Sequence, residues 1–157
     1  MRLTSFTDYS LRVLLYLAAR PGNRATIGEI AGAFDISENH LMKVAHFLGK
    51  ADFLVTSRGK HGGLSLARPA EKINLGQLVR LTETRALPAE CFDRHTNRCV
   101  IAPVCQLKGA LMEAVKAFNS VLDRYTLADI TGNRDALGKI LFIDPPSRHR
   151  GRAARPA

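Results

Sequence analysis

The stretch "TIGEIAGAFDISENHLMKVAHFLGK", residues 26–50, holds two short helical patterns joined by a tight connector. Thr26 and Glu29 have the spacing of a capping box and predict the start of the first helix, whose apolar period runs to Phe34. Ser37 is the expected N-cap of the second helix. That helix is expected to bury one apolar face, formed by Leu41, Val44, Ala45 and Leu48. Two such helices in succession indicate a helix-turn-helix.

The apolar period changes after residue 50. "FLVTS" (53–57) and "LSLA" (64–67) predict two short strands, and the glycines of "RGKHGG" (58–63) permit a tight hairpin tip between them. A hairpin that follows a helix-turn-helix gives the order of a winged helix-turn-helix. We therefore expect a mainly α fold with a small β-hairpin wing.

Further helices are expected on both sides of this unit. Ser5 and Asp8 have capping-box spacing and predict a first helix that ends at "RPGN" (20–23), and Asn74 is expected to cap a short helix. The longest periodic stretch repeats apolar residues at intervals of 4, 3, 4 and 3, at Leu111, Val115, Phe118, Leu122 and Tyr125. This heptad-like seam favours pairing with a second copy of the chain, and packing on its own domain is the alternative.

Four segments follow from these patterns. Residues 1–82 are expected to form the winged helix-turn-helix, and 83–106 a cysteine-bearing loop. Residues 107–144 would hold a dimerisation helix and a C-terminal helical segment. The arginine-rich stretch 145–157 has almost nothing to bury and is expected to be a disordered basic tail.

The charge points to a polyanionic partner. The chain carries 23 Lys and Arg against 14 Asp and Glu, a net charge of +9, and its body stays basic without the tail. Charge alone does not separate DNA from RNA or a membrane surface. The sequence lacks an apolar run of membrane-spanning length and a secretion signal, so we expect a cytoplasmic protein.

The second short helix supplies the candidate DNA contacts. In a helix-turn-helix its first turn enters the major groove, and in this sequence that turn offers Ser37, Asn39, His40 and Lys43. The wing tip adds Arg58 and Lys60, beside glycines that let the backbone approach a phosphate. The plain alternative is that Ser37 only caps its helix and Lys43 only solvates a surface.

All three cysteines lie within fifteen residues, in "CFDRHTNRCVIAPVCQLK" (91–108). An odd number in a reducing compartment favours metal ligation over disulfides. Paired Cys-x2-Cys knuckles, the usual zinc pattern, are missing, so the spacing Cys91-x7-Cys99-x5-Cys105 favours an iron-sulfur cluster over zinc. Three incidental cysteines are the weaker reading, because the surrounding residues are polar.

Two details bear on the ligands. Pro103 suits the first position of the next helix, which would place Cys105 in the first turn, where the helix dipole lowers a thiol pKa. Asp93 and His95 lie between the first two cysteines and are further candidates for a non-cysteine ligand of the metal, through oxygen and nitrogen.

The sequence resembles the Rrf2 family of iron-sulfur winged-helix regulators from residue 1 to about 144. The resemblance rests on the cysteine segment and on four further motifs: "LTSFTDYSLRVLLYLA" (3–18), "ENHLMKV" (38–44), "RGKHGGLSLARP" (58–69) and "LDRYTLADI" (122–130).

The resemblance implies a homodimeric repressor with a palindromic operator and a cluster on Cys91, Cys99 and Cys105. In the nitric-oxide-sensing branch the fourth ligand is similar to Asp8 of the partner subunit. A related branch uses a histidine three residues after the last cysteine, where this sequence has Lys108. The implied function is therefore nitric-oxide sensing through a 4Fe-4S cluster, with 2Fe-2S as the alternative cluster. One departure from the family is the seven-residue gap after Cys91, which is longer than in many relatives.

Other functions stay open at this point. A regulator of the same family that senses iron or cluster status, or a zinc-stabilised DNA-binding protein without sensing, would share the scaffold. An enzyme is not expected, because the sequence has no catalytic triad, carboxylate pair, phosphate-binding glycine loop or dinucleotide fingerprint in a suitable context.

Overall fold

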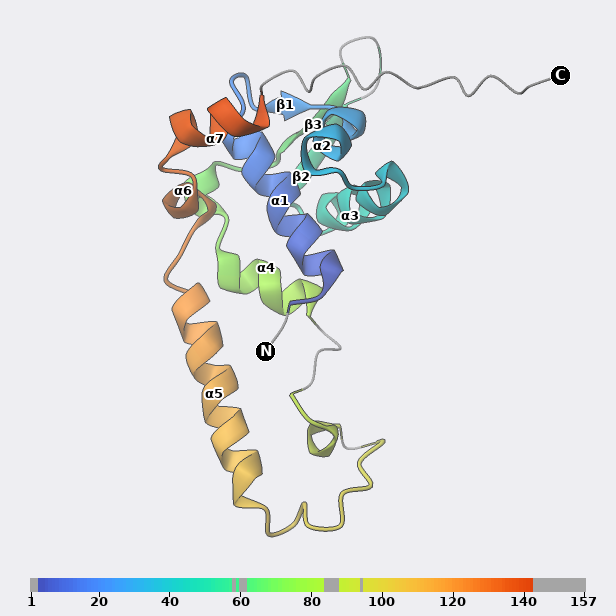
Figure 1. The fold of residues 1–157 in the computed structure, drawn as a ribbon, viewed down its shortest axis with the longest axis vertical. Coiled ribbons are helices and arrows are strands. Elements are labelled where there is room, and N and C mark those ends of the chain that lie inside the picture. Colours follow the sequence, from blue (N-terminus) through green and yellow to red (C-terminus); the bar gives the residue numbers. More distant parts are fainter. Residues whose placement is uncertain (1–2, 58, 60–61, 84–87, 94, 143–157) are drawn as a thin grey trace, which may run out of the picture.

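The computed structural model describes residues 3–57, 59, 62–83, 88–93 and 95–142 (Figure 1). Within them the chain is mainly α-helical with one small sheet, which confirms the predicted fold class. The elements run in the order α1 (Ser5–Ala19), β1 (Arg24–Ala25), α2 (Ile27–Phe34), α3 (Glu38–Lys50), β2 (Leu54–Ser57), β3 (Gly63–Leu66), the 3-10 turn η1 (Ala70–Lys72), α4 (Leu75–Thr82), the 3-10 turn η2 (Glu90–Phe92), α5 (Gln106–Leu122), α6 (Leu127–Ile130) and α7 (Arg134–Leu141).

Helix α1 is the centre of the hydrophobic core. Its Val13, Leu14 and Leu17 have no exposed surface, and each fully buried Leu contributes about 1.5–3 kcal/mol. The predicted inner face of α3, at Leu41, Val44, Ala45 and Leu48, is buried against this core. Helix α3 is thereby fixed on α1, and α2 packs on α3.

The sheet has three antiparallel strands in the order β1-β3-β2. The β2–β3 hairpin was predicted, but β1 was not, because a two-residue strand carries no readable period. Its Ala25 pairs with Leu64. A Cβ at Gly63 would lie 2.8 Å from the carbonyl oxygen of Ala25, so the glycine makes room for this added strand.

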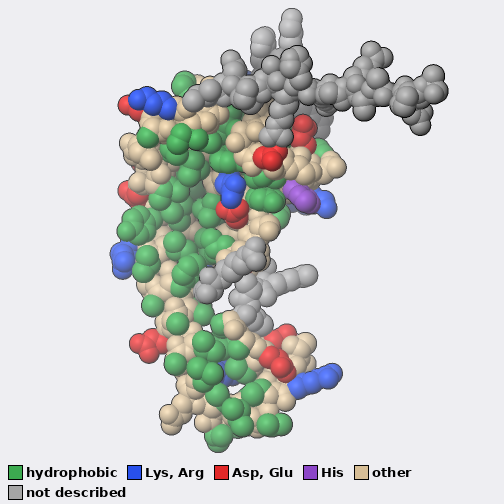
Figure 2. Space-filling model, in the orientation of Figure 1, with side chains coloured by type: hydrophobic (Ala, Val, Ile, Leu, Met, Phe, Trp, Pro, Cys, Tyr) green, Lys and Arg blue, Asp and Glu red, His purple; other side chains and the backbone are tan. Residues whose placement is uncertain are grey.

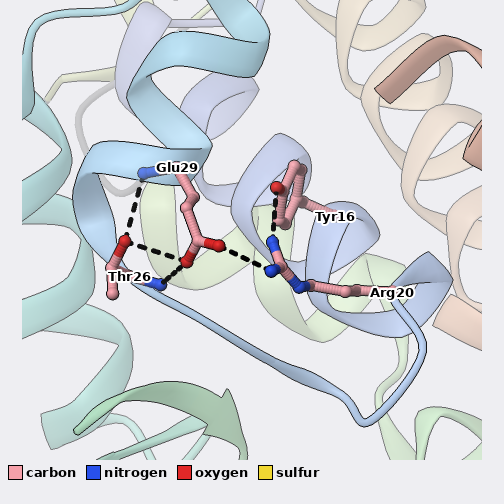
Figure 3. Close-up of polar contacts among 4 residues, drawn as sticks. All are labelled: Tyr16, Arg20, Thr26 and Glu29. Carbon is pink, nitrogen blue, oxygen red and sulfur yellow. Dashed lines mark hydrogen bonds and ion pairs between the residues drawn. The ribbon is translucent and has the colours of Figure 1, made fainter. Parts of the chain in front are cut away.

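The predicted capping box at the start of α2 is confirmed (Figure 3). The Thr26 amide donates to Glu29 Oε2 (2.7 Å), and the Glu29 amide donates to Thr26 Oγ1 (3.2 Å). Glu29 also pairs with Arg20, which donates to the Tyr16 hydroxyl at 2.8 Å. The hydrogen bonds from Thr26, and then the one from Arg20, hold the pKa of Glu29 below its usual range. The end of α1 is therefore tied to the start of α2.

The predicted start of α1 is wrong by one residue. Thr4, not Ser5, is the N-cap, and its side chain accepts from the Thr7 amide at 3.3 Å. Asp8 does not close a capping box and instead pairs with Arg12 at 2.9 Å. Either hydroxyl could cap a helix locally. Thr4 is also held by a tertiary contact with Glu83, which no local pattern contains.

Helix α5 begins later than a start at Pro103 would place it. Cys105 is its N-cap rather than a first-turn residue, and Pro103 precedes the helix in a turn. In that turn the Val104 amide donates to the Ile101 carbonyl at 3.0 Å, so the helical hydrogen-bond ladder starts only after Cys105. The Asn74 side chain caps α4 as predicted, accepting from the Gln77 amide.

Glu83, the residue after α4, joins that helix to the first turn of α1. Its Oε1 accepts from the Thr4 amide (2.7 Å), the Thr4 hydroxyl (3.0 Å) and the Thr7 hydroxyl. Burial raises the pKa of Glu83, but the hydrogen bonds from Thr7 and Thr4 outweigh it and hold that pKa below the ordinary value of 4.5.

Replacing the charged acceptor, Glu83→Gln, should lower the free energy of unfolding at pH 7 by about 1–2 kcal/mol. Since the pKa is lower in the folded state, this contribution is present above the ordinary pKa of 4.5 and is lost as the pH falls through the folded value. Urea titrations at pH 7 and pH 3 measure both. If Glu83→Gln lowered the free energy of unfolding equally at the two pH values, that would contradict a role for the charge. Glu71→Gln, at an exposed position of η1, is the control.

Candidate functional site

The outer face of α3 carries the four predicted contacts of the recognition helix. Ser37, Asn39, His40 and Lys43 are all exposed, whereas Leu41, Val44, Ala45 and Leu48 of the same helix are buried. Ser37 is the N-cap, but its side chain makes no capping hydrogen bond. Its hydroxyl is therefore available to a ligand, and so are the Asn39 amide, which can pair with adenine, and the Lys43 ammonium.

Two aromatic contacts hold this helix on α1. The ring of Tyr9 stacks on His40, with centroids 6.2 Å apart and an interplanar angle of 29°. Phe6 meets Phe47 edge-to-face at 5.2 Å. The first two turns of α1 thus contact both the start and the end of the recognition helix, and His40 has a packing partner as well as an exposed edge.

Sequence reasoning missed Met42 on the same helix. Its side chain is 48% exposed, beside the polar candidates rather than in the core. An apolar side chain on such a face suits the methyl group of thymine. The sequence held one sign of this exposed position: in "ENHLMKV", Met42 is apolar but does not fall on the helical period of the buried residues.

The other two predicted DNA contacts, Arg58 and Lys60, lie outside the described residues. The strands that lead to them are described. β2 and β3 pair from Leu54↔Leu66 to Ser57↔Gly63.

The three cysteines lie in the segment that links α4 to α5. Cys91 is in η2, Cys99 follows in the loop and Cys105 caps α5, and all three are free and half-buried. Figure 1 shows the described part of this segment at the lower end of the molecule, away from α2 and α3.

Local side-chain bonds shape this loop. Asp93 accepts from the His95 amide and the Thr96 hydroxyl, both at 2.8 Å, and Asn97 accepts from the Cys99 amide at 3.0 Å. The hydrogen bonds from His95 and Thr96 hold the pKa of Asp93 below its usual range. The carboxylate that sequence reasoning considered as a rival ligand is therefore engaged in the loop's own turn.

A single chain does not bring the predicted ligands together. Among the residues that the structure describes, no group of three or more His, Cys, Asp or Glu side chains could hold a metal ion. Asp8 lies on α1 and pairs with Arg12, both side chains being more than two-fifths exposed. The chemistry of the donors fits an iron-sulfur cluster, because thiolates are its usual ligands, but the arrangement within one chain is incomplete.

Apolar side chains gather around α5 and the cysteine segment, over the lower half of the face shown in Figure 2. Of the predicted seam, Leu111, Val115, Phe118 and Leu122 are half-buried, and Tyr125 is 44% exposed. The α5 face therefore packs only in part on its own chain. Further large apolar residues are exposed in and before this helix, at Val100, Ile101, Val104, Leu107, Met112 and Val121. No helix within the described ranges is long and apolar enough to cross a membrane.

Curated proteins supply close relatives of this chain. It is 50% identical over 142 residues to the HTH-type transcriptional regulator NsrR of Bacillus subtilis, covering 90% of this chain and 97% of that one. It is 46% identical over 146 residues to the NsrR of Halalkalibacterium halodurans, covering 92% and 100%. These relatives are named transcriptional regulators rather than enzymes.

Solved structures give the same fold. T. potens IscR superposes with a TM-score of 0.67 at 25% identity, covering 87% of this chain and 90% of that one. CymR, the global cysteine regulator of B. subtilis, gives a TM-score of 0.64 at 25% identity, covering 85% and 98%.

The family match spans both α3 and the cysteine segment. Residues 3–133 match the Rrf2 family, described as an iron-dependent transcriptional regulator. Because this match covers most of the chain and a curated relative is 50% identical to it, the chain belongs to the Rrf2 family of transcriptional regulators.

Proposed function

We propose that the chain is a homodimeric, cytoplasmic repressor that binds a palindromic operator and releases it when nitric oxide reacts with an iron-sulfur cluster. The observation that carries this proposal is the confinement of three free cysteines to one loop joined by α4 to a winged helix-turn-helix. The curated relatives named NsrR support the nitric-oxide signal.

Cys91, Cys99 and Cys105 would hold the cluster as thiolates, with Asp8 of the partner subunit as the fourth ligand. When bound, a 4Fe-4S cluster would supply an iron with a weaker oxygen ligand, where nitric oxide can attack. Asp8 and the cysteines of one chain form no group that could hold a metal ion, and the fourth ligand is taken from the second chain because the family resemblance implies it.

Recruiting Asp8 costs little free energy. Its ion pair with Arg12 joins residues four apart on a helix, and both side chains are more than 40% exposed. Such pairs contribute about 0.3–0.5 kcal/mol, far less than a metal bond supplies. Asp8 can therefore leave Arg12 without destabilising α1.

The partly covered apolar face of α5 supports the dimer. Leu107, Met112 and Val121 of α5 are exposed, and exposed apolar surface of this extent marks an interaction site. Pairing through this face would bring each cysteine loop toward a second chain.

The contacts of α1 supply a route from the cluster to DNA. Asp8 lies between Phe6 and Tyr9, which pack on Phe47 and His40 of the recognition helix. Freeing Asp8 would let α1 shift these rings, and with them the recognition helix. A coupling of about 1–3 kcal/mol changes DNA affinity roughly 5- to 150-fold, which suffices for derepression.

Sensing of iron or cluster status is the second candidate, supported by the family description and the likeness to IscR. Lys108 stands against it, since the related branch of the family has a histidine at that position, three residues after the last cysteine. Visible spectra of anaerobic protein before and after nitric oxide discriminate the signals. A colourless, zinc-bearing protein would contradict both.

Asn39→Ala should chiefly relax sequence preference, at a cost of about 1–3 kcal/mol at one base pair, because it removes a base contact. Lys43→Ala, Arg58→Ala and Lys60→Ala should weaken binding to all duplexes and reduce the salt slope by about one. Mobility-shift titrations over a range of salt measure both effects, with Lys72→Ala as the control. Unchanged operator affinity in all four variants would place the DNA surface elsewhere.

Single Cys91→Ser, Cys99→Ser and Cys105→Ser variants should each lose the stable cluster and operator binding yet remain folded dimers, because the α5 face does not depend on metal. Iron analysis and sedimentation test the two halves of this prediction. Iron content near wild type in any variant would remove that cysteine from the ligand set.

Asp8→Asn should alter cluster absorbance or speed cluster loss while leaving the thermal stability of the cluster-free protein near wild type. The amide keeps the size of the side chain but is a poorer ligand than a carboxylate. His95→Ala is the matched control and should keep the cluster.

Mixed dimers separate ligation across subunits from ligation within one. When one chain carries Asp8→Asn and the other lacks all three cysteines, cross-subunit ligation leaves one complete site, and ligation within a chain leaves none. With both defects on the same chain and a wild-type partner, the two results are exchanged. A complete cluster in this second mixed dimer would contradict the cross-subunit assignment.

A further inference from the structure

The end of α5 is fastened to the start of α4. The Asn74 side-chain amide donates to the Asp123 carbonyl at 2.7 Å, and the Leu75 amide donates to the Tyr125 carbonyl at 3.0 Å. An isolated antiparallel bridge joins Asn74 to Thr126 beside them. We call this contact the α4–α5 joint.

The joint leaves no room for a side chain on α4. A Cβ at Gly76 would lie 2.0 Å from Asp123 Oδ1 and 2.9 Å from the Asp123 backbone nitrogen. The carboxylate can rotate away, but the backbone cannot move without the end of α5. A glycine inside a helix costs about 1 kcal/mol relative to alanine, and here it permits this close approach.

Arg80 contacts the same residue one helical turn further along. Its Nη1 lies 2.6 Å from Asp123 Oδ1, and the two side chains are 48% and 44% exposed. At that exposure the ion pair adds little to folding stability. It gives Asp123 a second contact on α4, one turn beyond Gly76, so the end of α5 meets α4 at two points.

The rest of α5 depends on this joint for its orientation. The helix has 17 residues and none of them is buried, and its main packing partner in its own chain is α4. At 1.5 Å per residue it is about 25 Å long, so a tilt of about 10° moves its far end by about 4 Å, more than the 3.4 Å rise of one base pair.

We propose that Asp123, seated against Gly76, is a positioning residue that sets which half-site spacing the protein accepts. This inference rests on the proposed dimerisation through α5. If α5 joins the two subunits, its angle to α4 fixes the separation of the two α3 helices. Dimeric helix-turn-helix proteins require that separation to be about 34 Å, one DNA turn.

The test uses the cluster-loaded dimer and a duplex that the wild-type protein selects from a random library. Affinity is measured by fluorescence anisotropy for this duplex, for versions with two base pairs inserted or removed between the half-sites, and for a single half-site. The variants are Gly76→Ala and Asp123→Asn. Gly138→Ala in α7 is the control, because its Cβ would meet only ordinary contact, with Phe142 at 3.6 Å.

Wild type and Gly138→Ala should lose at least about tenfold in affinity when the spacing changes, whereas the two joint variants should lose less than about threefold. Single half-site affinity, iron content and dimer mass should match wild type, which a loss of folding would not allow. If Gly76→Ala does not fold, Asp123→Asn decides, since it keeps the side-chain volume and removes only the charge.

Spacing discrimination equal to wild type in the folded variants would overturn the role of the joint. A monomeric wild-type protein would instead overturn the proposed dimer, and sedimentation reports this separately. The two failures therefore give different results.

Discussion

The burial of α1 is the constraint on which the other elements depend. Val13, Leu14 and Leu17 are fully enclosed, and α1 contacts α3, α4, α6, α7 and β3. Because close-packed interiors do not deform gradually, a displacement of this helix must be shared by its neighbours. The Asp8 side chain is an exception within this helix, since it reaches solvent. A group that binds Asp8 therefore acts on the one helix that contacts most of the domain.

Polar contacts fix both ends of this helix. At its start, Glu83 accepts hydrogen bonds from Thr4 and Thr7, and at its end Arg20 joins Glu29 of the α2 capping box. The first contact ties α1 to the helix that leads into the cysteine segment, and the second ties it to the helix-turn-helix. Each bond is worth only about 1–3 kcal/mol. Together they fix both the helix-turn-helix and the helix before the cysteine loop on α1.

The two helices that flank the cysteine segment, α4 and α5, are joined at their ends remote from it. Asn74 and Asp123 fasten α4 to α5, while Asp93 and Asn97 shape the loop beyond them. Such a loop can hold three thiols in fixed order, yet the described part of one chain does not complete a metal site. The proposed second subunit supplies what the single chain lacks, and the α4–α5 joint would then set the geometry of the pair.

The sequence by itself determined the features that depend on near neighbours. The Thr26–Glu29 box, the Asn74 cap, the buried face of α3 and the hairpin all rest on residues within a few positions of one another, and each was predicted. The sequence also indicated the family, and it places all three cysteines in one segment. Only the tertiary structure decided that Thr4 rather than Ser5 caps α1, that β1 adds to the sheet and that Gly76 admits Asp123. In each case the deciding partner is distant in sequence: Glu83, Leu64 and the end of α5. Contacts between such distant positions leave no period or spacing in the chain, because their energy appears only once the core has brought them together.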